Sequence, residues 1–269
     1  MKFEHNTFGK RIKSMLKVDF RRMFTSRLFY IMVGICLVAP ILILVMTTMM
    51  DGSVSVNPQT GEETIVEGFD NVWQIIGTVS GGETNADAAM GMDMMAMCNM
   101  NLLYFGIAVL VCLFVADDFR SGYAKNLFTV RSKKTDYVIS KTLVLFVSSV
   151  ILVVMFAIGS LLGGAIAGLP FTMEGFNTAN LIMCLLSKML LVAVFVPIYL
   201  AVSVGAKQKS WASLLASFGV GALLFMMIPM MTPLNATAMN VLLCLAGGAL
   251  FSIGLGAVSN LILKKTSLV

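Results

Sequence analysis

Charged residues are scarce in this sequence of 269 residues, of which only 12% are Asp, Glu, Lys or Arg. Hydrophobic residues make up 58% of the chain, and its mean hydropathy is +0.90. Because a soluble domain carries about a quarter charged residues, this composition indicates an integral membrane protein. A net charge of +5 would suggest nucleic acid as a partner of a soluble protein, but here the basic residues lie where membrane topology requires them. We therefore expect no nucleic-acid partner.

The sequence also lacks the residues on which most catalytic and metal sites depend. Its single histidine, His5, lies in a basic tail, which argues against a histidine-based metal site or nucleophile. There is no Gly-x-x-x-x-Gly-Lys-Ser/Thr loop, so the chain cannot hydrolyse ATP by the usual route. The cysteines are scattered, without the paired spacing of a zinc site or a disulfide framework: Cys36, Cys98, Cys112, Cys184 and Cys244. We expect no catalytic residues, metal or cofactor in this chain.

Long apolar stretches predict an all-α membrane protein with six transmembrane helices. The first stretch has 23 residues without a charge, enough to cross a hydrocarbon core of about 30 Å. The six predicted spans are Leu28 to Met50, Met97 to Val115, Val138 to Ala167, Leu181 to Gly205, Trp211 to Met231 and Ala238 to Leu263. Small residues at four-residue spacing predict close helix packing in the third and sixth spans: Gly159, Gly163, Gly164 and Gly168, then Gly247, Gly248, Ser252, Gly254 and Gly256.

The distribution of Lys and Arg predicts the orientation. Eight of the 19 basic residues lie in residues 1–27 and six in residues 116–141, whereas residues 51–93 contain eight acidic residues and no basic one. Basic loops stay in the cytosol, so both termini are predicted to be cytosolic and residues 51–94 to form a large extracytoplasmic loop. We expect a multi-pass protein of the bacterial cytoplasmic membrane, in contact with membrane lipids.

Residues 1–27 are predicted to form an amphipathic helix at the cytosolic membrane interface. Apolar residues recur every three or four positions opposite a basic face: Phe8, Ile12, Met15, Leu16, Phe20, Met23 and Phe24. Basic side chains of such a helix reach anionic head groups. The alternative is a positively charged segment that only sets the orientation.

The extracytoplasmic loop offers two candidate features. Short extended pieces are predicted at residues 53–56 and 64–66, followed by a short helix around Trp73 that rests on the membrane surface. The excess of acidic residues either attracts cationic substrates or simply reflects the absence of positive charge from outside loops.

A methionine-rich patch, which includes Met94 and Met97, precedes the second span. Thioethers bind Cu(I), but they are also flexible apolar packing groups. Met94, Met97 and Trp73 are candidates for the substrate path.

Lys188 is the only charge within a predicted span when Lys141, at the start of the third span, is counted with the cytosolic loop. An ionisable residue inside a membrane helix is a functional candidate, here for the substrate path. Its position near the outer boundary also lets its side chain snorkel to the head groups, and we favour this second interpretation.

The stretch from Ala116 to Lys141 is the one long basic segment between two spans. An acidic pair opens it, and residues 119–128 place Phe119, Tyr123, Leu127 and Phe128 at helical spacing. The pattern predicts a short amphipathic helix beneath the membrane, or alternatively a solvated loop.

This stretch resembles the cytosolic loop of ABC type-2 transporter permeases. The resemblance rests on Asp118-Phe-Arg-Ser-Gly122, Lys125-Asn-Leu-Phe128 and the basic run that leads to Ser140-Lys141. The sequence departs from the family pattern at Tyr123, where Thr or Ser is usual, and at Val130-Arg131, where Pro is frequent. In the family, a short coupling helix in this loop docks on the ATPase subunit. By resemblance the ATPase-coupling residues are Asp117, Asp118, Phe119, Arg120, Gly122, Tyr123, Lys125, Leu127 and Phe128.

The resemblance implies a six-span permease domain over residues 28–269, with a coupling loop at 116–137. It implies a transport subunit of an ABC exporter that needs a separate ATPase, which binds ATP and Mg, and a second permease as homodimer or heterodimer. Similar permeases export, or confer immunity to, amphipathic and often cationic antimicrobial peptides. Drug or lipid export, a copper-linked transporter and a structural or signalling subunit without transport remain alternatives.

Overall fold

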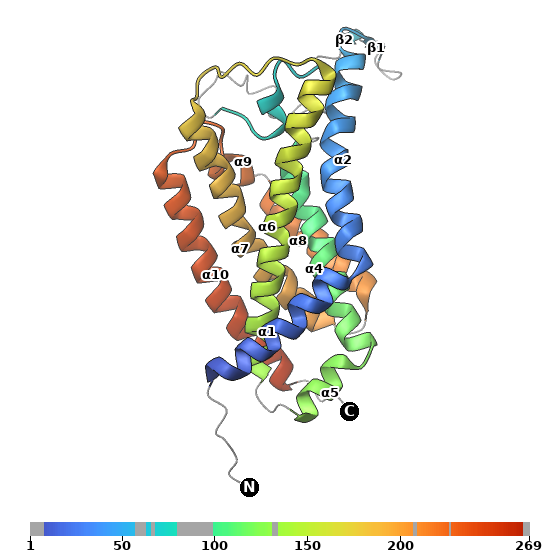
Figure 1. The fold of residues 1–269 in the computed structure, drawn as a ribbon, viewed down its shortest axis with the longest axis vertical. Helices are drawn as coiled ribbons and strands as arrows, with labels where there is room; N and C mark the ends of the chain where they lie inside the picture. Colours follow the sequence, from blue (N-terminus) through green and yellow to red (C-terminus); the bar gives the residue numbers. More distant parts are fainter. Residues whose placement is uncertain are drawn as a thin grey trace.

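The computed structural model describes residues 8–56, 63–65, 68–79, 99–130, 134–206, 209–225 and 227–265. It is a helical bundle (Figure 1), and its elements in chain order are α1 (Phe8–Thr25), α2 (Arg27–Met50), β1 (Val54–Val56), β2 (Glu63–Ile65), η1 (Val72–Ile75), η2 (Met100–Leu102), α4 (Leu103–Arg120), α5 (Tyr123–Val130), α6 (Lys134–Ala167), α7 (Thr178–Ala206), α8 (Ser210–Phe225), α9 (Met227–Met231) and α10 (Ala238–Lys265).

Five of the described segments are long and apolar enough to cross a membrane: α2, Met100–Arg120, α6, α7 and α10. They correspond to the first, second, third, fourth and sixth predicted spans. The fifth predicted span, residues 211–231, contains α8, with 16 residues, and the short helix α9, and residue 226 between them lies outside the described residues. The all-helical membrane architecture is therefore confirmed, and the sixth crossing stays a prediction.

Two helices extend further than their apolar runs. Helix α4 continues to Arg120, five residues beyond the predicted end, and α6 begins at Lys134, four residues before the predicted start. The charged residues Asp118 and Lys141 therefore lie on long helices, where their side chains have defined directions.

Helices α2 and α6 pack closely along the predicted glycine seam. A Cβ atom added to Gly159 would overlap the carbonyl oxygen of Leu37 and lie 2.7 Å from Cγ of Pro40. A Cβ on Gly163 would lie 2.8 Å from Cα of Ile41, and one on Gly164 would overlap Val72. Only glycine permits these approaches, which confirms the helix–helix seam at Gly159 and Gly163, whereas Gly164 packs against η1. Gly168 ends the helix in the left-handed region, with φ +73°.

The predicted small-residue face of α10 is confirmed in part. A Cβ on Gly248 would lie 2.8 Å from Cβ of Ala193 on α7, and the Ser252 hydroxyl donates to the carbonyl of Ala193 at 3.1 Å. Gly254 faces open space instead. Along α10 the close contact with α7 is thus limited to one side, and large side chains such as Leu250 and Ile253 are exposed.

The described strands and short helix that follow α2 lie at the opposite end of the bundle from α1 (Figure 1). The predicted extended pieces are confirmed as the antiparallel strands β1 and β2, with Ser55 opposite Thr64. The prediction that the helix around Trp73 rests on the membrane surface is wrong. Val72 and Trp73 are buried against the protein, where the Val72 N–H donates to the carbonyl of Pro170 and Trp73 meets the ring of Phe171 edge-on at 5.8 Å.

Candidate functional site

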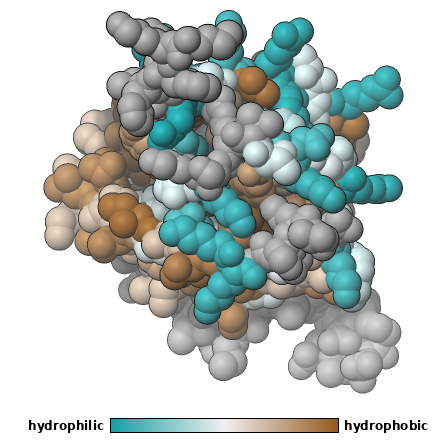
Figure 2. Space-filling view, turned by 90° about the horizontal axis from the view of Figure 1, so that it is seen from below, coloured by the Kyte–Doolittle hydropathy of each residue, from teal (hydrophilic) through white to brown (hydrophobic). Residues whose placement is uncertain are grey.

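Helix α1 crosses one end of the bundle, the end at which α5, the start of α6 and the end of α10 also lie (Figure 1). We call this the basic end. Seen from this side, hydrophilic residues gather over the middle of the surface, and hydrophobic residues are exposed along one edge (Figure 2). The predicted amphipathic helix is confirmed as α1, but its buried stripe, Met15, Asp19 and Met23, contains a carboxylate. Since these residues are at most 2% exposed, this stripe packs against the protein.

Asp19 is part of a buried cluster of charges that joins three helices. The ammonium of Lys141 on α6 lies 2.9 Å from Oδ1 of Asp19 and 2.7 Å from Oδ2 of Asp118 on α4. All three side chains have zero exposure. One cation therefore holds two carboxylates from helices that are distant in sequence. Removing one partner of such a buried group costs about 3–5 kcal/mol, since a charge is left without compensation.

Arg22 completes the charge balance of this cluster. Its Nη1 donates to Oδ1 of Asp118 at 2.5 Å, so two carboxylates face two cations. Burial by itself lowers the pKa of Arg22, but the carboxylate of Asp118 outweighs this, and the pKa is raised overall. The guanidinium therefore stays charged. We refer to Asp19, Arg22, Asp118 and Lys141 as the charge cluster.

Hydroxyl groups satisfy the remaining carboxylate oxygens. Ser140 donates to Oδ2 of Asp19 at 2.6 Å, and Tyr137 donates to Oδ2 of Asp118 at 2.8 Å. The hydroxyl of Tyr123 on α5 lies 3.5 Å from Oδ1 of Asp19. Burial raises the pKa of Tyr123, and the charges of Asp19 and Asp118 raise it further, so this hydroxyl stays protonated and can donate. A buried network with these partners is rigid.

Aromatic rings surround the two cations. The guanidinium of Arg22 lies 3.9 Å from the ring centroid of Tyr123, and the ammonium of Lys141 lies 4.2 Å from that of Phe114. Contacts of this kind contribute about 0.5–2 kcal/mol each. Through Tyr123, the short helix α5 is attached directly to the charge cluster.

A second ion pair fastens α1 to α6 at the other end of α1. Arg11 Nε lies 2.9 Å from Oδ2 of Asp136, which is almost fully buried. Two ion pairs more than two turns apart along α1 fix its direction across the basic end. Ion pairs therefore hold helices α1, α4 and α6 together at the basic end, and we expect them to move together.

The predicted amphipathic helix over residues 119–128 is interrupted. Helix α4 ends at Arg120, and Gly122 adopts φ +74° before α5 starts at Tyr123. The left-handed conformation is easily accessible to glycine, which explains the turn at this position. The predicted residues thus belong to the end of one helix, a turn and a second helix.

The predicted coupling residues divide into a buried and an exposed group. Asp118 and Phe119 are buried, and Tyr123, Leu127 and Phe128 are half-buried, with Phe128 edge-on to Tyr137 at 5.4 Å. Of the predicted residues Asp117, Arg120 and Lys125 are exposed, and three neighbours that were not predicted, Ser121, Asn126 and Thr129, are exposed beside them. We refer to these six residues as the exposed α5 face. Gly122 lies between the two groups.

Lys188 lies in a separate polar cluster towards the opposite end of the bundle. Its ammonium donates to Oδ1 of Asn101 at 2.8 Å and to the hydroxyl of Thr232 at 3.0 Å, and the Tyr104 hydroxyl donates to its backbone carbonyl at 2.9 Å. Lys188 is 1% exposed, so the prediction that it snorkels to the head groups is wrong. Within the described residues no carboxylate lies within ion-pair distance of it.

The other substrate-path candidates are not brought together with Lys188. Trp73 is buried in η1, and its indole N–H has no hydrogen-bond partner in the described part of the chain. Met94 and Met97 lie outside the described residues.

The sequence analysis missed the roles of three residues. Asp19 is the only acidic residue of α1 and lies at four-residue spacing between Met15 and Met23. Because this spacing places it on the apolar side of the helix, its burial could have been predicted. Lys141 was counted as a loop cation, although it lies about two turns inside α6. Asn101 carried no signal beyond its place at the start of an apolar run.

The comparisons with known proteins bear on this arrangement. The family model described as ABC-2 family transporter protein matches residues 15–222, which include most of α1, the helices α4, α5 and α6, and the whole charge cluster. No curated protein matches the chain, and no solved structure matches it. Since the model covers well over half of the sequence, this membrane protein belongs to the ABC-2 family of transporter proteins.

Proposed function

We propose that the chain is the transmembrane subunit of an ATP-driven exporter in the bacterial cytoplasmic membrane. The basic end faces the cytosol, α8 with α9 forms the fifth of six crossings, and residues 51–94 lie outside. The observation that carries the proposal is the attachment of α5: its outer face is exposed and polar, while Tyr123 on its other side contacts the charge cluster. A surface of this kind receives a partner and passes its movement to the bundle.

A separate ATPase subunit, with ATP and Mg bound to it, docks on the exposed α5 face. When the two ATPases of the assembly close on ATP, they displace α5. Because Arg22, Lys141 and the two carboxylates link α1, α4 and α6, the displacement moves these helices together rather than bending one of them. The bundle then rocks between inward-open and outward-open states.

A second permease, either another copy of the chain or a related one, completes the pore. The cargo we propose is an amphipathic or hydrophobic molecule such as an antimicrobial peptide. The acidic composition of residues 51–93 supports a cationic peptide, because negative charge at the outer opening raises the local concentration of cations.

The first test is the replacement of Lys125 by Glu. Lys125 is exposed on α5, so the change leaves the fold intact but reverses a charge on the docking surface. We expect the amount of ATPase that copurifies with the chain to fall about tenfold, the effect of ~1.4 kcal/mol of lost binding energy.

The matched control is Lys265→Glu, because Lys265 is equally exposed but lies at the end of α10. Equal loss of ATPase from both variants would indicate an unspecific charge effect. Retention of the ATPase by Lys125→Glu would remove α5 from the docking surface, and copurification of a partner without nucleotide hydrolysis would favour a signalling subunit.

Replacing Lys188 by Met tests the substrate path. The change removes a buried cation, which lowers a desolvation cost, but leaves Oδ1 of Asn101 without its donor. We expect the thermal stability of the protein to be maintained. We expect ATP-dependent transport to fall about tenfold, because the ammonium would no longer bind the cargo and a hydrogen bond to a charged group contributes roughly 1.5–3 kcal/mol. Unchanged transport in reconstituted vesicles would show that Lys188 is structural.

A further inference from the structure

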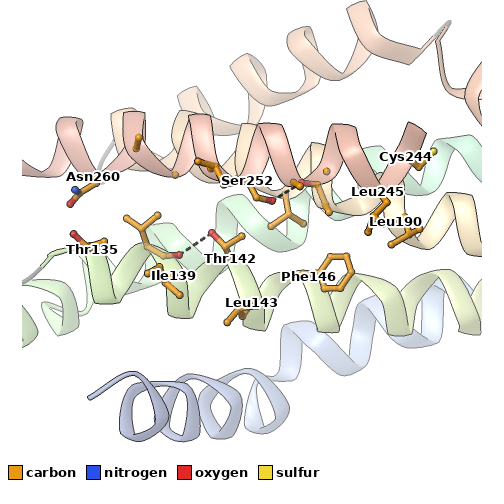
Figure 3. A pocket seen from close by; sticks show the side chains of 18 residues that line it. Thr135, Ile139, Thr142, Leu143, Phe146, Leu190, Cys244, Leu245, Ser252 and Asn260 are labelled. Carbon is orange, nitrogen blue, oxygen red and sulfur yellow. Dashed lines mark hydrogen bonds between the residues drawn. The ribbon is translucent and has the colours of Figure 1, made fainter. Parts of the chain in front are cut away.

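An open apolar groove runs along the outside of the bundle between α6, α7 and α10. Its volume is about 810 Å³. Figure 3 shows Phe146 on α6 on the side towards Leu245 of α10, with Leu190 of α7 beside them. Small side chains of α10, including Gly248, Ala249, Gly256 and Ala257, leave the space between the helices unfilled. The volume is within the range of ligand sites, about 300–1,000 Å³.

The groove is polar at one end only. Thr135 at the start of α6 and Asn260 near the end of α10 lie together at the basic end of the groove (Figure 3). The side-chain oxygen of Asn260 is buried and has no hydrogen-bond partner among the described residues. Because this oxygen accepts hydrogen bonds, its partner must be a donor such as a hydroxyl group of a lipid head group, and the apolar tract beyond it matches an acyl chain.

The basic end of the groove is also positively charged. Lys264 lies four residues after Asn260 and therefore one turn further along the same face of α10. Lys134, the residue before Thr135, donates to the carbonyl of Leu263 and so lies against the end of α10. None of the 18 residues that line the groove is charged. A ligand at this end therefore meets cations and no lining carboxylate.

We propose that the groove holds one resident anionic phospholipid, with an acyl chain between α6 and α10 and its phosphate at Lys264. The lining extends along α10 from Cys244 to Asn260, roughly 24 Å at 1.5 Å per residue, and one leaflet of a hydrocarbon core is about 15 Å thick. The groove is thus long enough for a full acyl chain. Anionic lipids are enriched in the cytosolic leaflet, where basic pockets between membrane helices bind their head groups.

A lipid fits this surface better than a second copy of the chain. A two-fold axis through the groove would place one groove against the other and Lys264 against Lys264. Such a contact would leave a hollow and repelling charges at its centre. The site is independent of the proposed export activity, since a lipid of the surrounding membrane fills it.

The experiment is native mass spectrometry of the full chain after reconstitution with equal amounts of phosphatidylglycerol and phosphatidylcholine, followed by detergent washing. We expect one phosphatidylglycerol per chain to be retained. Lys264→Gln should lower its retention about fivefold, the effect of one lysine near an anionic surface, whereas Lys265→Gln on the neighbouring face should not. Ala249→Phe fills the groove and should abolish retention, and Ala246→Phe, exposed on the same helix but outside the groove lining, should not.

Several outcomes would overturn the proposal. Equal retention of both lipids would show that the head group is not recognised, and equal effects of Lys264→Gln and Lys265→Gln would reduce it to diffuse surface charge. Full retention in Ala249→Phe would place the lipid elsewhere. Disulfide formation between two chains that carry Ala249→Cys would show that the groove is an interface between copies.

Discussion

Replacing Lys141 by Met is expected to release α1 from the bundle and to lower the stability of the protein by about 3–5 kcal/mol, the usual cost of breaking a buried ion pair. The ammonium of Lys141 is the only cation within 3 Å of Asp19 in the described structure, and it also contacts Asp118. Without it, two buried carboxylates share the single guanidinium of Arg22. The loss should appear as a lower unfolding temperature and as rapid tryptic cleavage of α1 at Lys17 and Arg21, which are exposed.

A second substitution separates loss of charge balance from loss of packing. Adding Asp19→Asn to Lys141→Met removes the excess negative charge but keeps an acceptor for Ser140, so most of the stability should return. Lys17→Met is the control for the removal of a lysine, because Lys17 is exposed on α1, and it should leave stability unchanged. If Lys141→Met were as stable as Lys17→Met, the charge cluster would not hold α1.

Replacing Gly159 by Ala is expected to separate α2 from α6. The added methyl group would overlap the carbonyl oxygen of Leu37 and lie 2.7 Å from Cγ of Pro40. Neither neighbour can rotate away, since one is backbone and the other is the ring of a proline within α2. Overpacking commonly costs about 1–3 kcal/mol, and we expect a loss at the upper end of that range because a whole helix must shift.

Gly34→Ala provides the matched control, because the same methyl group at Gly34 on α2 would meet nothing within 4 Å. Alanine favours the helix over glycine by about 0.5–1 kcal/mol, so this variant should be slightly more stable than the parent chain. The two unfolding temperatures should therefore move in opposite directions. A decrease of equal size in both variants would contradict the close approach of α2 and α6.

The membrane helices could be predicted from the sequence because each contains a long apolar run, although α4 and α6 extend beyond their runs into charged residues. The contact face of α6 could also be predicted, because glycines at four-residue spacing in a membrane helix are typical of close helix packing.

The candidate site was located by the sequence, but its internal organisation was not. The acidic pair and the basic residues of the 116–141 stretch indicated a coupling segment, and the exposed α5 face lies within it. The sequence could not predict that Asp118 is buried in ion pairs, because its partners Arg22 and Lys141 are 96 and 23 residues away in the chain. Lys188 was misjudged for a similar reason, since Asn101 and Thr232 meet it only in the folded bundle.

Photocrosslinking from residue 126 in intact cells tests the central claim most directly. Asn126 is exposed on α5, and a photoreactive amino acid at this position should form an adduct with an ATP-hydrolysing subunit. The same probe at Asn180, near the start of α7 at the other end of the bundle, should form none. An ATPase adduct from residue 180 but not from residue 126 would contradict the account, because it would place the motor at the opposite end of the molecule.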